Sequence, residues 1–283
     1  MSSDGFWPGD ARLVLTVSLM FEAGAQRRPE SVYLGPLGDM PSEYPDLPGD
    51  TYFEYGWTEA IPRLLDLFDE YSIKVTCFPV GLAIERSPDL MREIARRGHE
   101  CAAHGWEWVP QYAMSEDEER EFIQKSVRIV RDVCGNQPLG WNCWGLRGTP
   151  RTLELLQAEG FTYHIDEVNR DEPFVRNVKG EPFAVVPYTL HNNDLLCYEA
   201  LGFSTYDYLT QLKDEFDWLY EEAGSRRRMM PVPCHDRTTG RPARMKALRE
   251  FIRYALGHPG VVFMRRDAIA EVVLAEWRAA NGR

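Results

Sequence analysis

Acidic, imidazole and amide side chains gather where short apolar segments of the chain end. In chain order they are Glu22, His104, Asn142, Asp166 and His235. Apolar segments of this kind predict buried parallel strands. Because the carboxyl ends of the strands in a parallel barrel meet at one rim, we expect these side chains to lie close together there. Carboxylates and imidazoles at such a rim can act as general bases, general acids or metal ligands.

The elements that must position these residues alternate between strands and helices. The predicted strands cover residues 13–19, 74–80, 100–103, 161–165, 184–190, 230–234 and 261–264. Helices between them, such as 206–222 and 243–257, are predicted from capping residues and from apolar stripes of helical period. The alternation predicts an α/β fold with a parallel sheet closed into a barrel, and an open doubly wound sheet is the alternative. We expect one domain over residues 1–283.

Composition excludes several classes of partner. The chain of 283 residues has 32 basic and 44 acidic side chains and a net charge of −12. An acidic chain without a basic stripe repels phosphate backbones, so we expect no nucleic-acid partner. No apolar run approaches the roughly 18 residues of a transmembrane helix, and the first residues lack the pattern of a secretion signal. Because the 6 cysteines show no paired spacing, we expect reduced thiols, a cytoplasmic protein and no membrane contact.

Several motifs resemble those of the polysaccharide-deacetylase superfamily, the NodB-homology deacetylases. Residues 20–24 stand where that family has Thr-Phe-Asp-Asp-Gly, and residues 104–108 where it has His-(Ser/Thr/Gly)-x-x-His. Asn142 occupies the place of the family's arginine, and residues 233–235 supply a late histidine. The resemblance runs over almost the whole chain and implies a distorted parallel (β/α)7-type barrel.

The same motifs depart from the family at its metal site. In the family an Asp-His-His triad binds the metal, whereas here Ala23 and Trp108 occupy two of the three positions and only His104 remains. A catalytic zinc needs about three protein ligands. We therefore expect neither a metal nor another cofactor. This departure resembles the metal-independent allantoinases, and cyclic-imide hydrolases belong to the same neighbourhood.

The resemblance implies hydrolysis of a non-peptide carbon–nitrogen bond in a small cyclic amide, such as an allantoin-, hydantoin- or imide-like ring. Glu22 is the expected general base, with a pKa raised by apolar neighbours, and His235 is the expected acid for the leaving nitrogen. His104 would orient the water or the carbonyl, and Asn142 would stabilise the oxyanion. Activated rings suit a site that lacks the carbonyl polarisation of a metal.

Further residues are expected to bind the substrate. They are Glu54, Trp108, Asn142, Trp144, Asp166, Asp194 and Arg241. Together with Trp106, Trp141 and the proline-rich segment 27–50, they predict a small covered pocket for a small molecule rather than an open groove. By resemblance alone we also expect a homo-oligomer, namely a tetramer.

Other interpretations stay open at this point. A metal-dependent N-deacetylase of amino sugars or peptidoglycan would have to use His104, His235 and Glu22 as substitute ligands. A catalytically inactive binding protein is a second alternative, although it would need to keep neither Glu22 nor His235. Cys143 lies near the predicted rim, but the sequence identifies no base for a cysteine nucleophile.

Overall fold

The central strand of the fold is β1 (Leu13–Phe21), which is buried along its whole length. The computed structural model describes residues 5–25, 44–45 and 47–282, so most of the proline-rich segment 27–50 lies outside the described residues. Strand β1 pairs in parallel with three others, and a further strand pairs with β2. These strands are β2 (Thr76–Pro79), β8 (Met229–His235), β9 (Val261–Phe263) and, beside β2, β3 (Glu100–Cys101).

A second sheet continues from β3 through a parallel bridge between Ala103 and Trp141. Its order is β4 (Gly140–Trp141), β5 (Tyr163–His164), β7 (Glu181–Val185) and β6 (Phe174–Val178). All of these pairs are parallel except β6 with β7. The predicted α/β fold with a mostly parallel sheet is therefore confirmed.

The antiparallel β6–β7 hairpin differs from the predicted strand at 184–190. Its turn contains Lys179 and Gly180, both with positive φ, at 49° and 91°. Two consecutive residues in this conformation form the tight turn that joins antiparallel strands. The predicted strand instead ends at Val185, and the chain after it turns toward the cavity.

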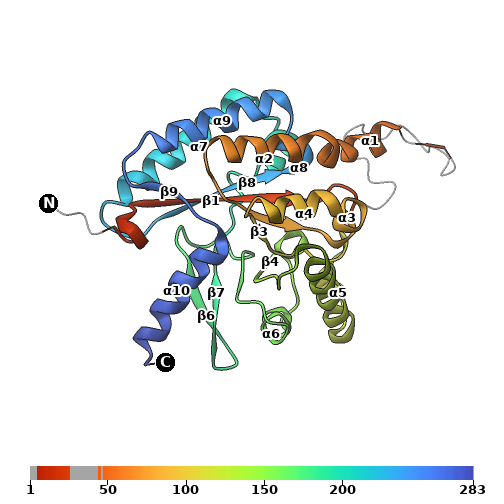
Figure 1. Ribbon diagram of the computed structural model, residues 1–283. Helices are drawn as coiled ribbons and strands as arrows, with labels where there is room; N and C mark the ends of the chain where they lie inside the picture. Colours follow the sequence, from red (N-terminus) through yellow and green to blue (C-terminus); the bar gives the residue numbers. More distant parts are fainter. Residues whose placement is uncertain (1–4, 26–43, 46, 283) are drawn as a thin grey trace.

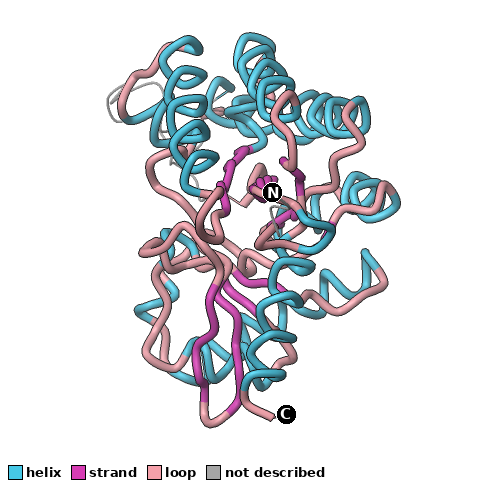
Figure 2. The backbone as a smooth tube through the Cα atoms, turned by 90° about the vertical axis from the view of Figure 1, so that its left-hand side faces the viewer, coloured by secondary structure: helices cyan, strands magenta, loops and turns pink. Residues whose placement is uncertain are grey.

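The helices cover the outside of the two sheets. They are α1 (Leu47–Tyr55), α2 (Ile61–Glu70), α3 (Gly81–Arg86), α4 (Pro88–Arg96), α5 (Glu116–Cys134), α6 (Thr152–Ala158), α7 (Thr205–Glu222), α8 (Asp236–Thr239), α9 (Pro242–Leu256) and α10 (Arg266–Ala280). Figure 1 shows α2, α7 and α9 on one side of β1, and Figure 2 shows the hairpin beside the C-terminal helix. None of the helices in the described part of the chain is long and apolar enough to cross a membrane.

Buried polar contacts join the two sheets behind the strand ends. Arg266, the first residue of α10, is fully buried. Its Nε donates to Ser18 Oγ on β1 over 3.0 Å, and its Nη1 donates to the carbonyls of Val186 and Pro187 over 2.6 and 3.1 Å. Burial lowers the pKa of this guanidinium to about 10. Arg266 thus ties β1 to the segment that leads from β7 to the cavity.

This position gives a test of stability. Arg266→Ala should lower the free energy of unfolding by about 3 kcal/mol or more, because it leaves a cavity and several buried acceptors without donors. Arg265→Ala is the matched control. Its guanidinium pairs with Asp267 near the surface, so the loss should stay within about 1 kcal/mol. Urea denaturation measures both, and equal losses would contradict the role given to Arg266.

Candidate active site

Glu22 is the first residue after β1, and its position is fixed through its backbone. The N–H groups of Glu22 and Ala23 both donate to Asp236 Oδ2, over 3.0 and 2.8 Å. Asp236 begins α8, directly after β8, the strand that lies beside β1. The neighbouring ends of β1 and β8 therefore fix the Glu22 carboxylate in the lining of a cavity. Its side chain is nearly buried, with 6% of its surface exposed.

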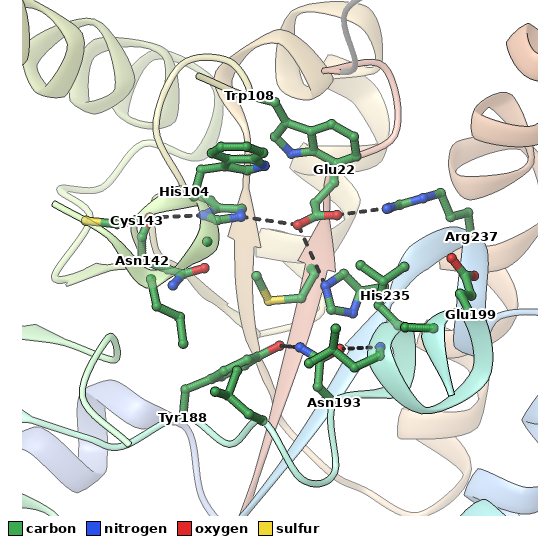
Figure 3. A pocket seen from close by; sticks show the side chains of 18 of the residues that line it. Glu22, His104, Trp108, Asn142, Cys143, Tyr188, Asn193, Glu199, His235 and Arg237 are labelled. Atoms are coloured by element: carbon green, nitrogen blue, oxygen red, sulfur yellow. Dashed lines mark hydrogen bonds and ion pairs between the residues drawn. The ribbon is translucent and has the colours of Figure 1, made fainter. Parts of the chain in front are cut away.

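Three nitrogen groups surround this carboxylate (Figure 3). Oε1 lies 3.2 Å from His104 Nε2 and 3.8 Å from His235 Nε2. Oε2 accepts a hydrogen bond of 2.9 Å from Arg237 Nη1. The sequence placed Glu22, His104 and His235 at one rim, and the structure brings them together.

Arg237 was not among the residues predicted for the site. Its guanidinium lies over the rings of Phe53 and Trp108, with Cζ 5.0 and 5.1 Å from the ring centroids. An arginine held against aromatic faces keeps its charge while it is shielded from water. The sequence feature that could have identified Arg237 as a site residue was its position two residues after His235, at the same strand end.

The charges around Glu22 decide its pKa. Burial by itself would raise this pKa, but the nearby His235, His104 and Arg237 outweigh burial and hold it well below its usual range. The expectation of a raised pKa is therefore wrong. The sequence showed the apolar neighbours of Glu22, but it did not show that a guanidinium binds the carboxylate directly.

His104 takes part in two hydrogen bonds that define its protons. Its Nδ1 lies 2.9 Å from the carbonyl oxygen of Asn142. A carbonyl oxygen only accepts, so Nδ1 carries a proton. The contact between Nε2 and the Glu22 carboxylate then also requires a proton, because otherwise two lone pairs would face each other. His104 thus donates from Nδ1 to a backbone carbonyl, which holds the ring in place with Nε2 against the Glu22 carboxylate.

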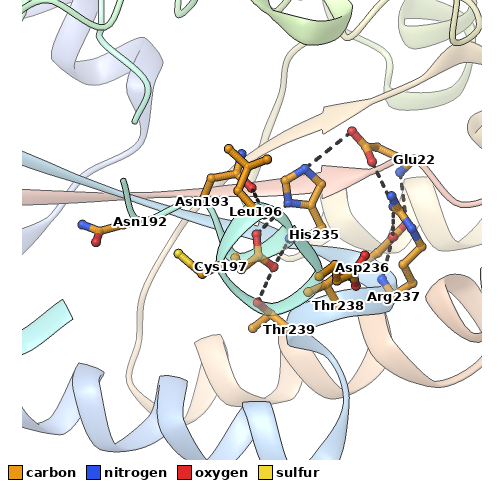
Figure 4. A network of polar contacts seen from close by, with 12 residues as sticks. Glu22, Asn192, Asn193, Leu196, Cys197, His235, Asp236, Arg237, Thr238 and Thr239 are labelled. Carbon is orange, nitrogen blue, oxygen red and sulfur yellow. Dashed lines mark hydrogen bonds and ion pairs between the residues drawn. The ribbon is translucent and has the colours of Figure 1, made fainter. Parts of the chain in front are cut away.

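His235 is oriented by Asp194. Its Nδ1 lies 2.6 Å from Asp194 Oδ1, and Asp194 Oδ2 accepts from the His235 backbone N–H over 2.8 Å and from Thr239 Oγ1 over 2.5 Å (Figure 4). Burial lowers the pKa of His235, but the carboxylates of Asp194 and Glu22 raise it above its ordinary value. Asp194 is fully buried behind the imidazole. It is therefore a positioning residue, and the expectation that it binds the substrate directly is corrected.

Asn142 lines the cavity with its amide in a defined orientation. Its Nδ2 donates to Asp166 Oδ1 over 2.7 Å, and the same oxygen accepts from the backbone N–H of Cys143. One of the two N–H bonds of this amide is thus engaged by Asp166, and the amide can still present its other N–H and its carbonyl oxygen to a ligand. The expected oxyanion role of Asn142 therefore stays a prediction. Asp166 lies behind Asn142 and orients it.

The cavity has a volume of about 470 Å³, and both Trp108 and Trp144 line it as predicted. Residues that were not predicted for the site also line it, among them Phe53, Tyr188 and Asn193. Tyr188 and Asn193 both come after β7. In the sequence, Tyr188 lies inside the predicted strand 184–190 and Asn193 lies in the polar segment that follows it.

Other predicted residues lie away from the cavity. Glu54 is exposed on α1, and Arg241 stacks on Tyr55, with Cζ 3.7 Å from the ring centroid. Trp141 is in the core, and Trp106 packs over Gly81. A position at a strand end or in a loop does not fix the direction of a side chain, so these predictions are corrected.

The residues at the family's metal position do not fit a metal. Ala23 has no donor atom in its side chain, and both nitrogens of His104 are engaged. Arg237 already places a positive charge on Glu22 Oε2, which opposes a second cation there. Within residues 5–25, 44–45 and 47–282, no group of three or more histidine, cysteine, aspartate or glutamate side chains could hold a metal ion.

Cys143 is not suited to act as a nucleophile. The side chain is buried, and burial together with Asp166 holds the pKa of this thiol well above its ordinary value. The sulfur accepts a hydrogen bond of 3.3 Å from Trp141 Nε1. A thiol that stays protonated lacks the reactive thiolate, so the geometry favours acid–base chemistry by Glu22 and His235.

Comparison with known proteins supports the family resemblance that the sequence motifs indicate. A family model described as polysaccharide deacetylase matches residues 51–164. The crystal structure of a probable polysaccharide deacetylase from Pseudomonas aeruginosa PAO1 is 35% identical, covers 94% of this chain and 92% of its own, and superposes with a TM-score of 0.85. PuuE allantoinase is 36% identical over 96% of this chain and 92% of its own, also with a TM-score of 0.85. A peptidoglycan deacetylase of Helicobacter pylori is 27% identical over 75% of this chain and 83% of its own.

The contact between His235 and Asp194 gives a direct prediction. Asp194→Asn removes the negative charge that raises the pKa of His235 and leaves the burial that lowers it. The pKa should therefore fall by about 1 to 3, and His235 should lose its proton at a lower pH than in the wild type. An NMR titration of the imidazole measures this. Asp214→Asn, at an exposed position on α7, is the control, and an unchanged His235 titration in Asp194→Asn would contradict the assignment.

Proposed function

The chain belongs to the polysaccharide deacetylase family, whose hydrolases act on carbon–nitrogen bonds, and we propose that it opens small cyclic amides by hydrolysis without a metal. The observation that carries this proposal is the Glu22 carboxylate bound by Arg237 where the family's motif would place a metal. The likeness to PuuE allantoinase, at 36% identity over nearly the whole chain, supports a cyclic ureide or imide as the substrate.

In the proposed reaction, Glu22 accepts a proton from water as the water oxygen bonds to the carbonyl carbon of the ring. The carbon–nitrogen bond of the resulting tetrahedral intermediate then breaks, and His235 Nε2 donates its proton to the leaving nitrogen. The proton on Glu22 returns to His235, whose Nε2 lies 3.8 Å from Glu22 Oε1. The sum of these steps adds one water to the ring, and both side chains recover their starting states.

The low pKa of Glu22 limits the choice of substrate. A carboxylate that is held by a guanidinium stays ionised at neutral pH, but it is a weak base. A site without a metal also lacks the carbonyl polarisation that a metal supplies. Both features call for an electrophilic carbonyl. Imides and cyclic ureides offer one, whereas the N-acetyl group of an amino sugar does not.

Donors and acceptors in the cavity suit an amide within a ring. Tyr188 Oη accepts from Asn193 Nδ2 over 3.3 Å, so its own O–H proton remains to be donated. Burial and the charges of Asp194 and Glu22 hold the pKa of Tyr188 well above its ordinary value, which keeps that proton in place. We assign Tyr188 to the ring carbonyl and the oxygen of Asn142 to the ring N–H, because in a ring both groups point to the same edge.

Trp108 adds a further donor. Its indole Nε1 is buried and has no hydrogen-bond partner within the described residues. A buried donor without a partner is costly unless a ligand or water uses it. Because Trp108 lines the cavity, its N–H is available to a carbonyl oxygen or to the attacking water.

The second candidate function is N-deacetylation of an amino sugar, which is favoured by the likeness to the peptidoglycan deacetylase of Helicobacter pylori. The inactive binding protein is the third. The complete set of contacts from Asp194 through His235 to Glu22 argues against it, since a protein that only binds has no need of an oriented acid–base pair.

A substrate panel separates these functions. Succinimide, dihydrouracil and allantoin should be opened at measurable rates that do not change after treatment with EDTA, and acetylated chito-oligomers should not be turned over. Glu22→Gln should lower the rates on the order of 10²-fold or more, and Cys143→Ala should retain them. Turnover of the acetylated sugars alone would replace the proposal with the deacetylase function. Loss of ring opening in EDTA would show that the reaction needs a metal.

A further inference from the structure

Several large apolar side chains line the cavity, and we call them together the apolar wall. This apolar wall consists of Trp144, Leu146, Leu190, Leu195 and Leu196. Three of them keep a large exposed fraction, 37% for Trp144, 46% for Leu190 and 37% for Leu196. Large apolar side chains that stay exposed around a hollow are typical of a surface that a ligand covers.

The catalytic groups come from different elements of the fold. Glu22, His104 and His235 come from the carboxyl ends of strands and converge on one carboxylate (Figure 3). The apolar wall instead comes from two short helical turns, η4 (Trp144–Leu146) and η5 (Leu196–Ala200), and from the chain just before η5. A ligand that fills the cavity therefore meets both the polar groups of the strand ends and the apolar side chains of these turns.

Polar residues beside the apolar wall are already engaged within the protein. Asn193 donates from Nδ2 to Tyr188 Oη, and its Oδ1 accepts from the backbone N–H of Leu196 over 3.0 Å. Glu199 Oε1 accepts from Thr238 Oγ1 over 2.7 Å and from a second hydroxyl, that of a tyrosine on α1. A polar substituent placed against the apolar side chains would lose its hydration there, which costs free energy.

The cavity is also larger than the volume that an unsubstituted ring would fill. Its volume of about 470 Å³ falls within the range of roughly 300–1,000 Å³ found for pockets that enclose drug-sized ligands. An unsubstituted five-membered ring held at Glu22 would leave the apolar wall in contact with water. A larger apolar group on the ring would displace that water.

From these observations, and resting on the proposed ring-opening function, we infer that the preferred substrate is a cyclic ureide or imide that carries a branched alkyl or aryl substituent. The ring lies against Glu22 and His235, and the substituent covers the apolar wall. An unsubstituted ring, or one with a polar substituent of the same size, should be a poorer substrate.

Three hydantoins that differ at one carbon test the inference. They are hydantoin, 5-isobutylhydantoin and allantoin, which is 5-ureidohydantoin. The isobutyl and ureido groups have nearly the same size and shape and differ in polarity. We expect kcat/KM for the isobutyl compound to exceed that for allantoin by about tenfold or more, as apolar contacts in a pocket discriminate.

A pair of variants connects this preference to the wall. Leu196→Asn keeps much of the shape of the side chain and makes the wall polar, so the ratio of isobutyl to ureido turnover should fall about fivefold or more. Leu201→Asn is the matched control, because Leu201 is 66% exposed and does not line the cavity. It should leave the ratio unchanged.

The outcomes distinguish this inference from the function on which it rests. If hydantoin is opened but allantoin equals or exceeds the isobutyl compound, the inference is wrong and the proposed function stands. The same holds if Leu196→Asn keeps the wild-type ratio. If none of the three rings is opened, both the inference and the proposed function fail.

Discussion

The ion pair between Glu22 and Arg237 is the contact on which the rest of the site depends. A carboxylate as buried as Glu22 would be very unfavourable without a partner. Arg237 supplies the opposite charge over 2.9 Å, and its own position is fixed by Asp236 and by the faces of Phe53 and Trp108. Since Asp236 also accepts from the backbone at Glu22, one short segment after β8 holds both partners.

This arrangement explains why the loss of the family's metal ligands need not mean the loss of a reaction. Arg237 takes the role of a local positive charge, but it cannot offer an open coordination position to a carbonyl oxygen as a metal does. In the proposed reaction, polarisation of the carbonyl therefore depends on hydrogen-bond donors such as Tyr188 and Trp108, and on the substrate itself. Under the proposed function, an activated ring and a metal-free site are then two consequences of the same contact.

Much of this organisation could be predicted from the sequence. Apolar runs located the parallel strands, and the rule that their carboxyl ends meet at one rim brought Glu22, His104 and His235 together correctly. Resemblance to the family motifs identified the lost metal ligands at Ala23 and Trp108. These features follow from periodicity and position, which a sequence records directly.

The remainder depends on side-chain directions and on partners distant in the chain. Nothing in the sequence showed that Arg237 would turn toward a residue 215 positions away. The apolar neighbours of Glu22 alone suggested a raised pKa, whereas the nearby His235, His104 and Arg237 lower it. The amide orientation of Asn142 is set by Asp166, and Arg241 turns to Tyr55 and away from the cavity. The β6–β7 hairpin was missed because its strands lack a regular apolar alternation, with two exposed residues in the middle of β6.

The rate of ring opening by metal-free Arg237→Met, with and without added zinc, tests the central claim most directly. Methionine keeps much of the length of the side chain and removes its charge, and Arg241→Met is the matched control outside the cavity. The account predicts a rate lower on the order of 10²-fold or more than that of the wild type, no recovery with zinc, and a near-normal rate for Arg241→Met. A near-normal rate for Arg237→Met, or a rate that zinc restores, would contradict the claim that Arg237 holds the catalytic carboxylate in place of a metal.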